Sequence, residues 1–360
     1  MTPRRVLLLL VVGLLVIAFA VWVASRRHLE RNTLTGDLVL PGMQAALNSV
    51  SEVRLSKGDG TRTELAKGAS GWTVVQRQYP ADSGKVRKLL LELAALKVVE
   101  EKTRTPENYP LLGVEDVTSP KATGTEVEAI TPGKTFAIII GKSSSAKSGF
   151  VRVNKALQSL LASPLITLDA DPRQWLDRTL LDIPQERIQE VSVHPAQGPA
   201  YSASRATKEQ SDFTVAGIPK GRELSNPMAA DPIAGSLGGL MLEDVQKAPA
   251  TPATTAAPAE RSHATFKTFD GLQVELVGHK DGTRSLISVS VASSAKATQA
   301  EAAALSARVN GWEFEIPSYK YDGLYRPLED LLKKPEPAKK AAHASGKAHA
   351  GTKQAAAPPH

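Results

Sequence analysis

The chain has 360 residues, of which 42% are hydrophobic, and it contains no cysteine. This length exceeds what one hydrophobic core needs and suits two domains, and the hydrophobic content is ordinary for a chain that folds in water. The lack of cysteine excludes disulfides, a thiolate nucleophile and cysteine-ligated zinc.

The net charge of +7 is concentrated at the two ends of the chain. Residues 1–37 hold five arginines against one glutamate and one aspartate, and residues 333–360 hold six lysines against one glutamate. These ends carry +3 and +5, which leaves residues 38–332 at −1. Nucleic-acid binding requires a basic face on the folded structure, so we expect no nucleic-acid partner.

The first predicted element is a membrane anchor from Val6 to Ala24, nineteen residues without a charged side chain. As a helix it would be roughly 28 Å long, close to the hydrocarbon thickness of a bilayer. A cleaved signal peptide competes with this interpretation, because Ala18-Phe19-Ala20 has the A-x-A form, although such apolar cores usually have about 7–15 residues. A buried helix of a soluble protein is the third possibility. We assign residues 1–28 to the anchor and 29–49 to a connector.

The first predicted repeat covers residues 50–184. It opens with a hairpin around Gly58-Asp59-Gly60, and a strand follows at 72–75. Asp82 or Ser83 can cap the next helix, whose apolar residues recur at spacings of three and four. We interpret this stripe as packing on its own sheet, although a membrane or partner helix would share the pattern. The stripe consists of Val86, Leu89, Leu90, Leu93 and Leu96.

The second part of this repeat is predicted to be mostly strands. Residues 136–140 are continuously apolar and indicate a central strand. Asp171, as N-cap, and Pro172, at the first helical position, predict a helix that extends through Leu181, and Pro184 ends the repeat. The strands are predicted at 126–130, 135–140, 150–153 and 165–168.

The second predicted repeat, residues 185–334, contains the same signals in the same order. Phe213-Thr214-Val215 follows Trp72-Thr73-Val74 by 141 residues, and Pro219 follows Pro80 by 139. Gly278-His279 follows Gly141-Lys142 by 137. Such matches indicate a duplication. We therefore predict an α+β protein, in which an N-terminal transmembrane helix precedes two duplicated α+β lobes with mainly antiparallel sheets.

The second repeat departs from the first at its helix and in an insertion. Its helix is predicted to start at Asp231-Pro232 and to carry three glycines, each costing about 1 kcal/mol relative to alanine. Residues 247–262 and the tail 335–360 are too polar and low in complexity to fold, so we expect both to be disordered. The residues expected to face inward from this helix are Ile233, Leu237, Leu240 and Met241. Strands are predicted at 264–269, 272–277, 285–291 and 312–317, and a helix at 295–309.

No catalytic, cofactor-binding or metal-binding residues are predicted. Gly141-Lys142-Ser143 resembles the end of a phosphate-binding loop, but that loop needs glycine at position 136, which is Phe136. The folded region contains three histidines, which by themselves nominate no catalytic set. We interpret the paired acids Glu100-Glu101 and Glu115-Asp116 as solvated turns. The three histidines are His194, His263 and His279, and the tail adds His343, His349 and His360.

Several segments resemble the bacterial DUF4340 family of unknown function. They begin with the block GWTVVQRQYPADSGKVRKLLLELAALKVVE, continue with YPLLGVED, IIIGK and GFVRV, and end with QWLDRTLLDIP. The resemblance covers most of residues 50–334 and implies a single-pass envelope protein. It also implies a role beside ABC-type transporters of the gliding-motility kind. The resemblance implies no active-site residues.

We therefore expect a non-enzymatic accessory or scaffold protein of the bacterial inner membrane, anchored by Val6 to Ala24, with its body in the periplasm and transporter subunits as partners. The alternative is a module that binds an envelope polymer or an anionic surface, with the lysine-rich tail 335–360 adding contacts to polymer or anionic lipid. An unrecognised hydrolase is the third hypothesis.

Overall fold

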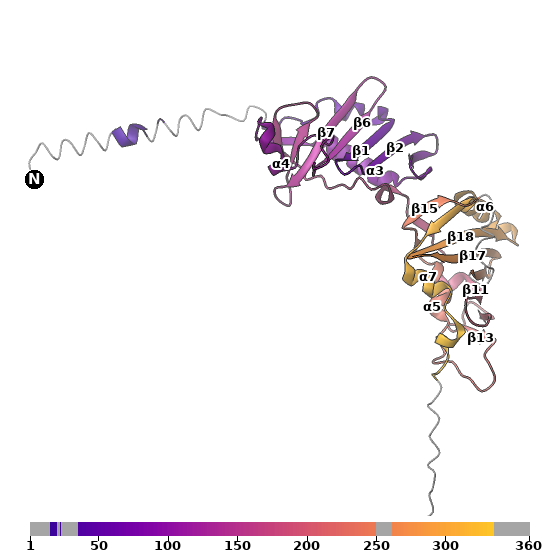
Figure 1. The fold of residues 1–360 in the computed structure, drawn as a ribbon. Helices are drawn as coiled ribbons and strands as arrows, with labels where there is room; N and C mark the ends of the chain where they lie inside the picture. Colours follow the sequence, from indigo (N-terminus) through magenta and orange to yellow (C-terminus); the bar gives the residue numbers. More distant parts are fainter. Residues whose placement is uncertain (1–14, 20–21, 23–34, 250–260, 335–360) are drawn as a thin grey trace, which may run out of the picture.

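A computed structural model describes residues 15–19, 22, 35–249 and 261–334, and it forms two α+β lobes (Figure 1). Within these residues, no helix combines the length and the hydropathy needed to cross a bilayer. The predicted anchor, Val6 to Ala24, lies outside the described residues except for 15–19 and 22, which are helical and exposed.

The first lobe is built on a nine-stranded sheet in which every neighbouring pair is antiparallel. Alternating side chains point to opposite faces of the sheet. In β1, Val53 and Leu55 are buried, and the other residues of the strand are partly exposed. In spatial order the strands are β4 (Tyr79–Pro80), β3 (Gly71–Val74), β2 (Arg62–Gly68), β1 (Glu52–Lys57), β6 (Thr125–Ile130), β7 (Thr135–Ser143), β8 (Gly149–Val153), β9 (Ser159–Ser163) and β5 (Lys97–Glu101).

Helix α3 (Ser83–Ala95) covers part of this sheet as predicted. Asp82 is its N-cap, and its Oδ1 accepts a hydrogen bond from the backbone N–H of Lys85 at 2.9 Å. All five residues of the predicted apolar stripe are buried. The short helices of this lobe are α2 (Met43–Ala46), η1 (Leu47–Ser49), η2 (Pro106–Asn108) and α4 (Tyr109–Leu112).

The second lobe repeats the strand order of the first. With β11 as the counterpart of β1, its eight-stranded antiparallel sheet matches the order β3-β2-β1-β6-β7-β8-β9-β5, strand for strand. Among the described residues, this sheet lacks only a counterpart of β4 at the edge. In spatial order the strands are β13 (Thr214–Ala216), β12 (Tyr201–Ser204), β11 (Ile188–His194), β16 (Ser262–Thr268), β17 (Leu272–Asp281), β18 (Arg284–Ser293), β19 (Trp312–Glu315) and β15 (Asp244–Lys247).

The remaining elements cover the second sheet and join the lobes. Strand β10 (Thr179–Leu181) pairs with β14 (Leu240–Met241) in a separate two-stranded sheet. The helices are η3 (Pro172–Trp175), η4 (Gln185–Arg187), α5 (Asp231–Ala234), η5 (Gly235–Leu237), η7 (Lys296–Thr298), α6 (Gln299–Val309), α7 (Ser318–Leu324) and η8 (Leu328–Leu331).

Two predictions near the end of the first repeat were wrong. The strand expected at 165–168 lies instead at Ser159–Ser163, where it ends before Pro164, which has no N–H to continue the ladder. The helix expected from Asp171 to Leu181 is a single 3₁₀ turn, although Asp171 caps it by accepting from the N–H of Arg173. Leu176 then bridges Ala81 in extended backbone, and β10 follows, so these apolar residues are buried by long-range pairing.

Three details of the second repeat also differ from prediction. Leu240 and Met241 form β14 rather than helix, and Met241 is exposed. Lys247 pairs with Trp312 and Ser262 with Gly278, so both ends of the predicted insertion 247–262 are strand; residues 250–260 lie outside the described residues. Like those residues, the predicted disordered tail 335–360 lies outside the described part of the chain.

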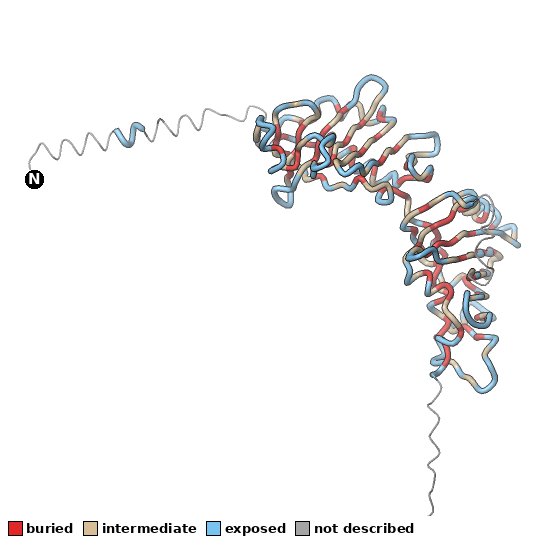
Figure 2. The backbone as a smooth tube through the Cα atoms, viewed as in Figure 1, coloured by how far each residue is buried: buried red, intermediate tan, exposed pale blue. Residues whose placement is uncertain are grey.

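A single buried apolar cluster runs through both lobes, and Figure 2 shows buried residues along the strands of each. At the junction, the ring of Tyr79 on β4 meets the rings of Trp312 and Phe314 on β19 edge-on, at 5.3 and 5.9 Å between centroids. Beside them, Arg77 forms a two-pronged ion pair with Asp244, with N–O distances of 2.6 and 2.8 Å. The lobes are therefore joined by a shared hydrophobic core and by an ion pair.

Candidate functional site

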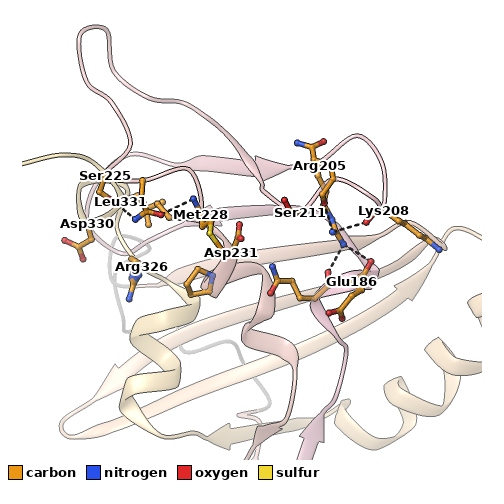
Figure 3. A pocket seen from close by; sticks show the side chains of 15 residues that line it. Glu186, Arg205, Lys208, Ser211, Ser225, Met228, Asp231, Arg326, Asp330 and Leu331 are labelled. Atoms are coloured by element: carbon orange, nitrogen blue, oxygen red, sulfur yellow. Dashed lines mark hydrogen bonds between the residues drawn. The ribbon is translucent and has the colours of Figure 1, made fainter.

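The site that stands out is a cavity of about 830 Å³ in the second lobe (Figure 3). It is bounded by η4, the loop between β12 and β13, the segment that leads into α5, and the segment after α7. Its lining residues are Gln185, Glu186, Arg205, Lys208, Gln210, Ser211, Ser225, Asn226, Met228, Ala229, Asp231, Pro232, Arg326, Asp330 and Leu331.

The cavity occurs where the second lobe departs from the internal repeat. In the first lobe the N–H of Asp82 donates to the carbonyl of Trp175, and in the second the N–H of Ser225 donates to the carbonyl of Leu331, both at 2.8 Å. After Asp82 comes the thirteen-residue helix α3, whereas after Ser225 come an irregular segment and the four-residue α5. Proline disfavours a helical residue before it, and Pro227 and Pro232 lie in this stretch. The shortened helix leaves the space open.

Arg205 forms one wall of the cavity, and its guanidinium is buried and saturated with hydrogen bonds. The group stacks on the rings of Phe213 and Phe269, at 5.0 and 5.4 Å. Its N–H groups point to backbone oxygens, as the dashed lines in Figure 3 show for part of the set, so Arg205 holds the wall together and has little left for a ligand. The acceptors are the carbonyls of Ile188, Gln185, Glu186, Lys208 and Gln210, at 2.7 to 3.5 Å.

The remaining cavity residues mix both charges with amides. Burial raises the pKa of Asp231, although the N–H of Phe213 donates weakly to its Oδ1 at 3.4 Å. Met228 adds an apolar side chain that is 59% exposed. A lining with donors, acceptors and one adaptable thioether suits a polar, extended ligand such as a polypeptide segment.

A second cavity, of about 500 Å³, holds His279, Glu313 and Ser288. Nδ1 of His279 lies 3.6 Å from Oε1 of Glu313, which is beyond hydrogen-bond length. The other oxygen of Glu313 accepts from Nε2 of Gln246 at 2.7 Å. No hydrogen bond joins Ser288 to His279 in the part of the chain that the structure describes, so these residues do not form a relay that would activate a nucleophile.

The other residues considered from the sequence have structural partners or stand apart. His194 and His263 lie opposite each other on β11 and β16, away from any cluster that could hold a metal within residues 35–249 and 261–334. Glu100 pairs with Lys102, and Asp116 with Arg152. One oxygen of Glu115 accepts from the N–H of Thr123 at 3.1 Å.

Gly141-Lys142-Ser143 lies within β7 and is a packing motif. Nζ of Lys142 donates to the carbonyls of Pro110 and Leu111, at 3.0 and 3.3 Å. A Cβ on Gly141 would lie 2.4 Å from the carbonyl oxygen of Leu112. The glycine therefore admits the end of α4 against the strand, and the lysine caps that helix.

The chain matches the family model DUF4340, a domain of unknown function, over residues 72–261. This chain belongs to the DUF4340 family. The match starts in β3 and ends at the residue before β16, so the DUF4340 region crosses the lobe junction. No curated protein and no solved structure matches the chain.

The segments that suggested DUF4340 in the sequence build the fold rather than the cavity. The first block supplies Tyr79 at the lobe junction and helix α3, and QWLDRTLL supplies Leu176 and β10. The cavity residues come from four separated segments, and none of them was predicted. The sequence did contain one signal, the proline and glycine residues that interrupt the second helix. They showed where the second repeat departs from the first, but not which side chains would meet there.

Proposed function

We propose that this DUF4340 protein is a non-enzymatic, membrane-anchored scaffold that binds a protein partner in its second-lobe cavity. The observation that carries the proposal is the position of the cavity, where the second lobe lacks a full counterpart of helix α3. Residues that break a local rule of the fold tend to cluster at functional sites. The lining offers hydrogen bonds and charges of both signs, which supports the binding of a protein surface.

The location and the kind of partner rest on the sequence. The uncharged run from Val6 to Ala24 has the length of a membrane span, which supports a single-pass anchor in a bacterial inner membrane with the body in the periplasm. The resemblance to DUF4340 proteins supports transporter subunits of the ABC type as partners.

The test is site-specific photo-crosslinking of the full-length protein in cells. A benzoylphenylalanine replaces Met228 in the cavity, and the control replaces Leu91, which is 51% exposed on α3 in the first lobe. We expect the Met228 position to crosslink to a membrane-transport subunit and the Leu91 position not to do so.

Two outcomes would overturn this proposal. Crosslinks from position 228 to cell-wall polymer alone would favour an envelope-binding module instead. Equal crosslinking from both positions would show that the cavity has no special role. Charge reversal by Arg326→Glu, on the cavity rim, should weaken the specific crosslink because the partner meets a charge of the wrong sign.

A further inference from the structure

The chain enters the first lobe along the outer edge of its sheet. The N–H of Gly36 donates to the carbonyl of Val98 at 2.8 Å, and the N–H of Val98 donates to the carbonyl of Asp37 at 2.9 Å. Leu38 bridges Lys97 in antiparallel register. Toward the N-terminus the segment therefore runs along β5 in the direction of Glu101, and Oγ1 of Thr35 reaches the carbonyl of Val99.

The turn between β8 and β9, residues 154–158, lies at that end of β5. The N–H of Lys102 donates to the carbonyl of Ser159 at 2.8 Å, and the N–H of Ser159 donates to the carbonyl of Thr103 at 2.9 Å. Figure 1 shows α4 at the end of the first lobe that is far from the second lobe. The entry point, the turn and α4 therefore share one corner of the molecule.

This corner presents two exposed leucines on a braced framework. Leu157 is 65% exposed at the turn, and Leu111 is 70% exposed on α4. The hydroxyl of Tyr109 on α4 donates to the carbonyl of Leu157 at 2.6 Å, and Nη1 of Arg152 donates to the carbonyl of Ala156 at 3.0 Å. The backbone of the turn is fixed from two sides while its leucine points outward.

Basic side chains flank the leucines. Arg104 donates from Nε to the side chain of Gln158 in the turn and is exposed. Lys155 is exposed within the turn, at a positive φ of 64°. Glu107, on η2, is an exposed acid in the same region. Exposed leucine beside lysine and arginine favours the surface of an anionic bilayer.

The length of chain before the described body limits how far this corner can stand from the membrane. Residues 25–34 separate the proposed anchor from Thr35. Ten residues span at most about 36 Å when fully extended. The corner therefore lies within reach of the bilayer surface, because it includes the entry point at Thr35.

We propose that this corner of the first lobe rests on the bilayer, with Leu157 and Leu111 at the boundary between headgroups and acyl chains and with Arg104 and Lys155 on anionic headgroups. The inference rests on the anchor of the proposed function, and it adds the face that the body turns to the membrane. A body held in this way has a fixed orientation on the membrane. The second lobe then points away from the bilayer.

The absence of cysteine allows single labels to test this. The variants Leu157→Cys and Leu111→Cys carry an environment-sensitive NBD fluorophore, and the full-length protein is reconstituted in vesicles of phosphatidylethanolamine and phosphatidylglycerol with nitroxide-labelled lipid. Tyr319→Cys is the matched control, because Tyr319 is 71% exposed on the second lobe. Ile17→Cys reports on the anchor itself.

We expect a blue-shifted emission and quenching by shallow nitroxides at positions 157 and 111, deep quenching at position 17, and neither effect at position 319. Quenching at 17 without quenching at 157 and 111 would overturn this inference and leave the anchor intact. A loss of quenching at 17 would remove the anchor and the inference together. A blue shift at 157 without quenching would assign the leucines to a protein contact and would also overturn the inference.

Discussion

At the scale of single residues, one glycine in each lobe lets a segment pack closely on the sheet. Gly141 on β7 lies under the end of α4, and Gly278 on β17 lies under two tyrosine rings. A Cβ at Gly278 would lie 2.5 Å from Cε2 of Tyr325 and 2.7 Å from Cε2 of Tyr321. Gly278 packs on tyrosines of the main core, whereas Gly141 packs beside Val114 of a separate cluster, so the two glycines do not occupy the matching positions that the sequence predicted.

Gly278→Ala should destabilise the protein, because the added methyl group forces two packed rings apart. Overpacking of this kind costs about 1–3 kcal/mol in the free energy of unfolding, measured by urea denaturation. The matched control is Gly323→Ala in α7, where a Cβ meets nothing within 4 Å. That change should be neutral or stabilise by up to about 1 kcal/mol. Equal effects of the two substitutions would contradict the packing argument.

Glu126 on β6 should make stability depend on pH. Its burial, and then the nearby Glu128 and Asp116, raise its pKa above the ordinary 4.5. Because the folded-state pKa is the higher one, the stabilising contribution of this group is complete below the unfolded pKa and is lost as pH rises through the folded pKa.

Glu126→Gln removes this titration and keeps an oxygen that can accept from Nδ2 of Asn154. The free energy of unfolding of the variant relative to wild type should therefore rise as pH increases above about 4.5 and then level off. Denaturation at a series of pH values measures it, with the exposed Glu107→Gln as control. A difference that does not change with pH would refute the prediction.

At the scale of elements, the helix between β4 and β5 of the first lobe has no full counterpart between β13 and β15 of the second lobe. Helix α3 has a continuous apolar stripe and a capping aspartate. In its place the second lobe has four residues of α5 and three of η5, in a stretch that contains Pro232, Gly235 and Gly238. Proline and glycine weaken helix interiors. These residues therefore explain why the helix of the second lobe is short and leaves a cavity beside it.

Asp82→Ala should weaken α3 by removing the acceptor for the N–H of Lys85. Loss of an N-cap costs about 1 kcal/mol, seen as a lower midpoint of chemical denaturation. Asp82→Ser retains a capping oxygen and should recover most of the loss. If serine were no better than alanine, the hydrogen bond at the cap would not be the source of the effect.

At the scale of the whole molecule, the segment before α3 and the matching segment before α5 make different contacts. The carbonyl of Pro80 accepts from the N–H of Asp177, and the carbonyl of Glu223 accepts from the N–H of Lys333, both at 2.9 Å. By this match the counterpart of Pro80 is Glu223 and not Pro219, which corrects the sequence alignment, and the counterpart of Tyr79 is Arg222. Tyr79 packs on the next lobe, whereas Arg222 forms an ion pair with Glu329 at 3.0 Å. A polar terminal face is typical of the last unit in a repeated structure.

Tyr79→Ala should uncouple the lobes, because it removes the ring that fills the space against Trp312 and Phe314. Truncating a buried aromatic side chain costs about 3–5 kcal/mol. Calorimetry should then resolve two transitions where wild type has one, and small-angle scattering should show a larger radius of gyration. Tyr319→Ala, at an exposed tyrosine, is the control. A single, unshifted transition in the Tyr79 variant would show that the junction does not couple the lobes.

The candidate site was not predicted from the sequence because it is assembled from side chains of distant segments. Arg205, Met228 and Arg326 belong to three of them, and no spacing along the chain relates them. The misplaced helix after Asp171 has a similar cause. Its apolar residues fit a helical pattern, but the lobe junction buries them in extended backbone.

The sequence by itself determined the α+β class, the antiparallel strands, helix α3 and the DUF4340 family, because these depend on local periodicity, capping and family motifs. The repeated order of elements was also visible in it. Only the tertiary structure decided how the strands are ordered in each sheet, that Tyr79 joins the lobes, and where the shortened helix leaves a cavity. Those features depend on contacts between residues far apart in the chain, and such contacts leave no period in it.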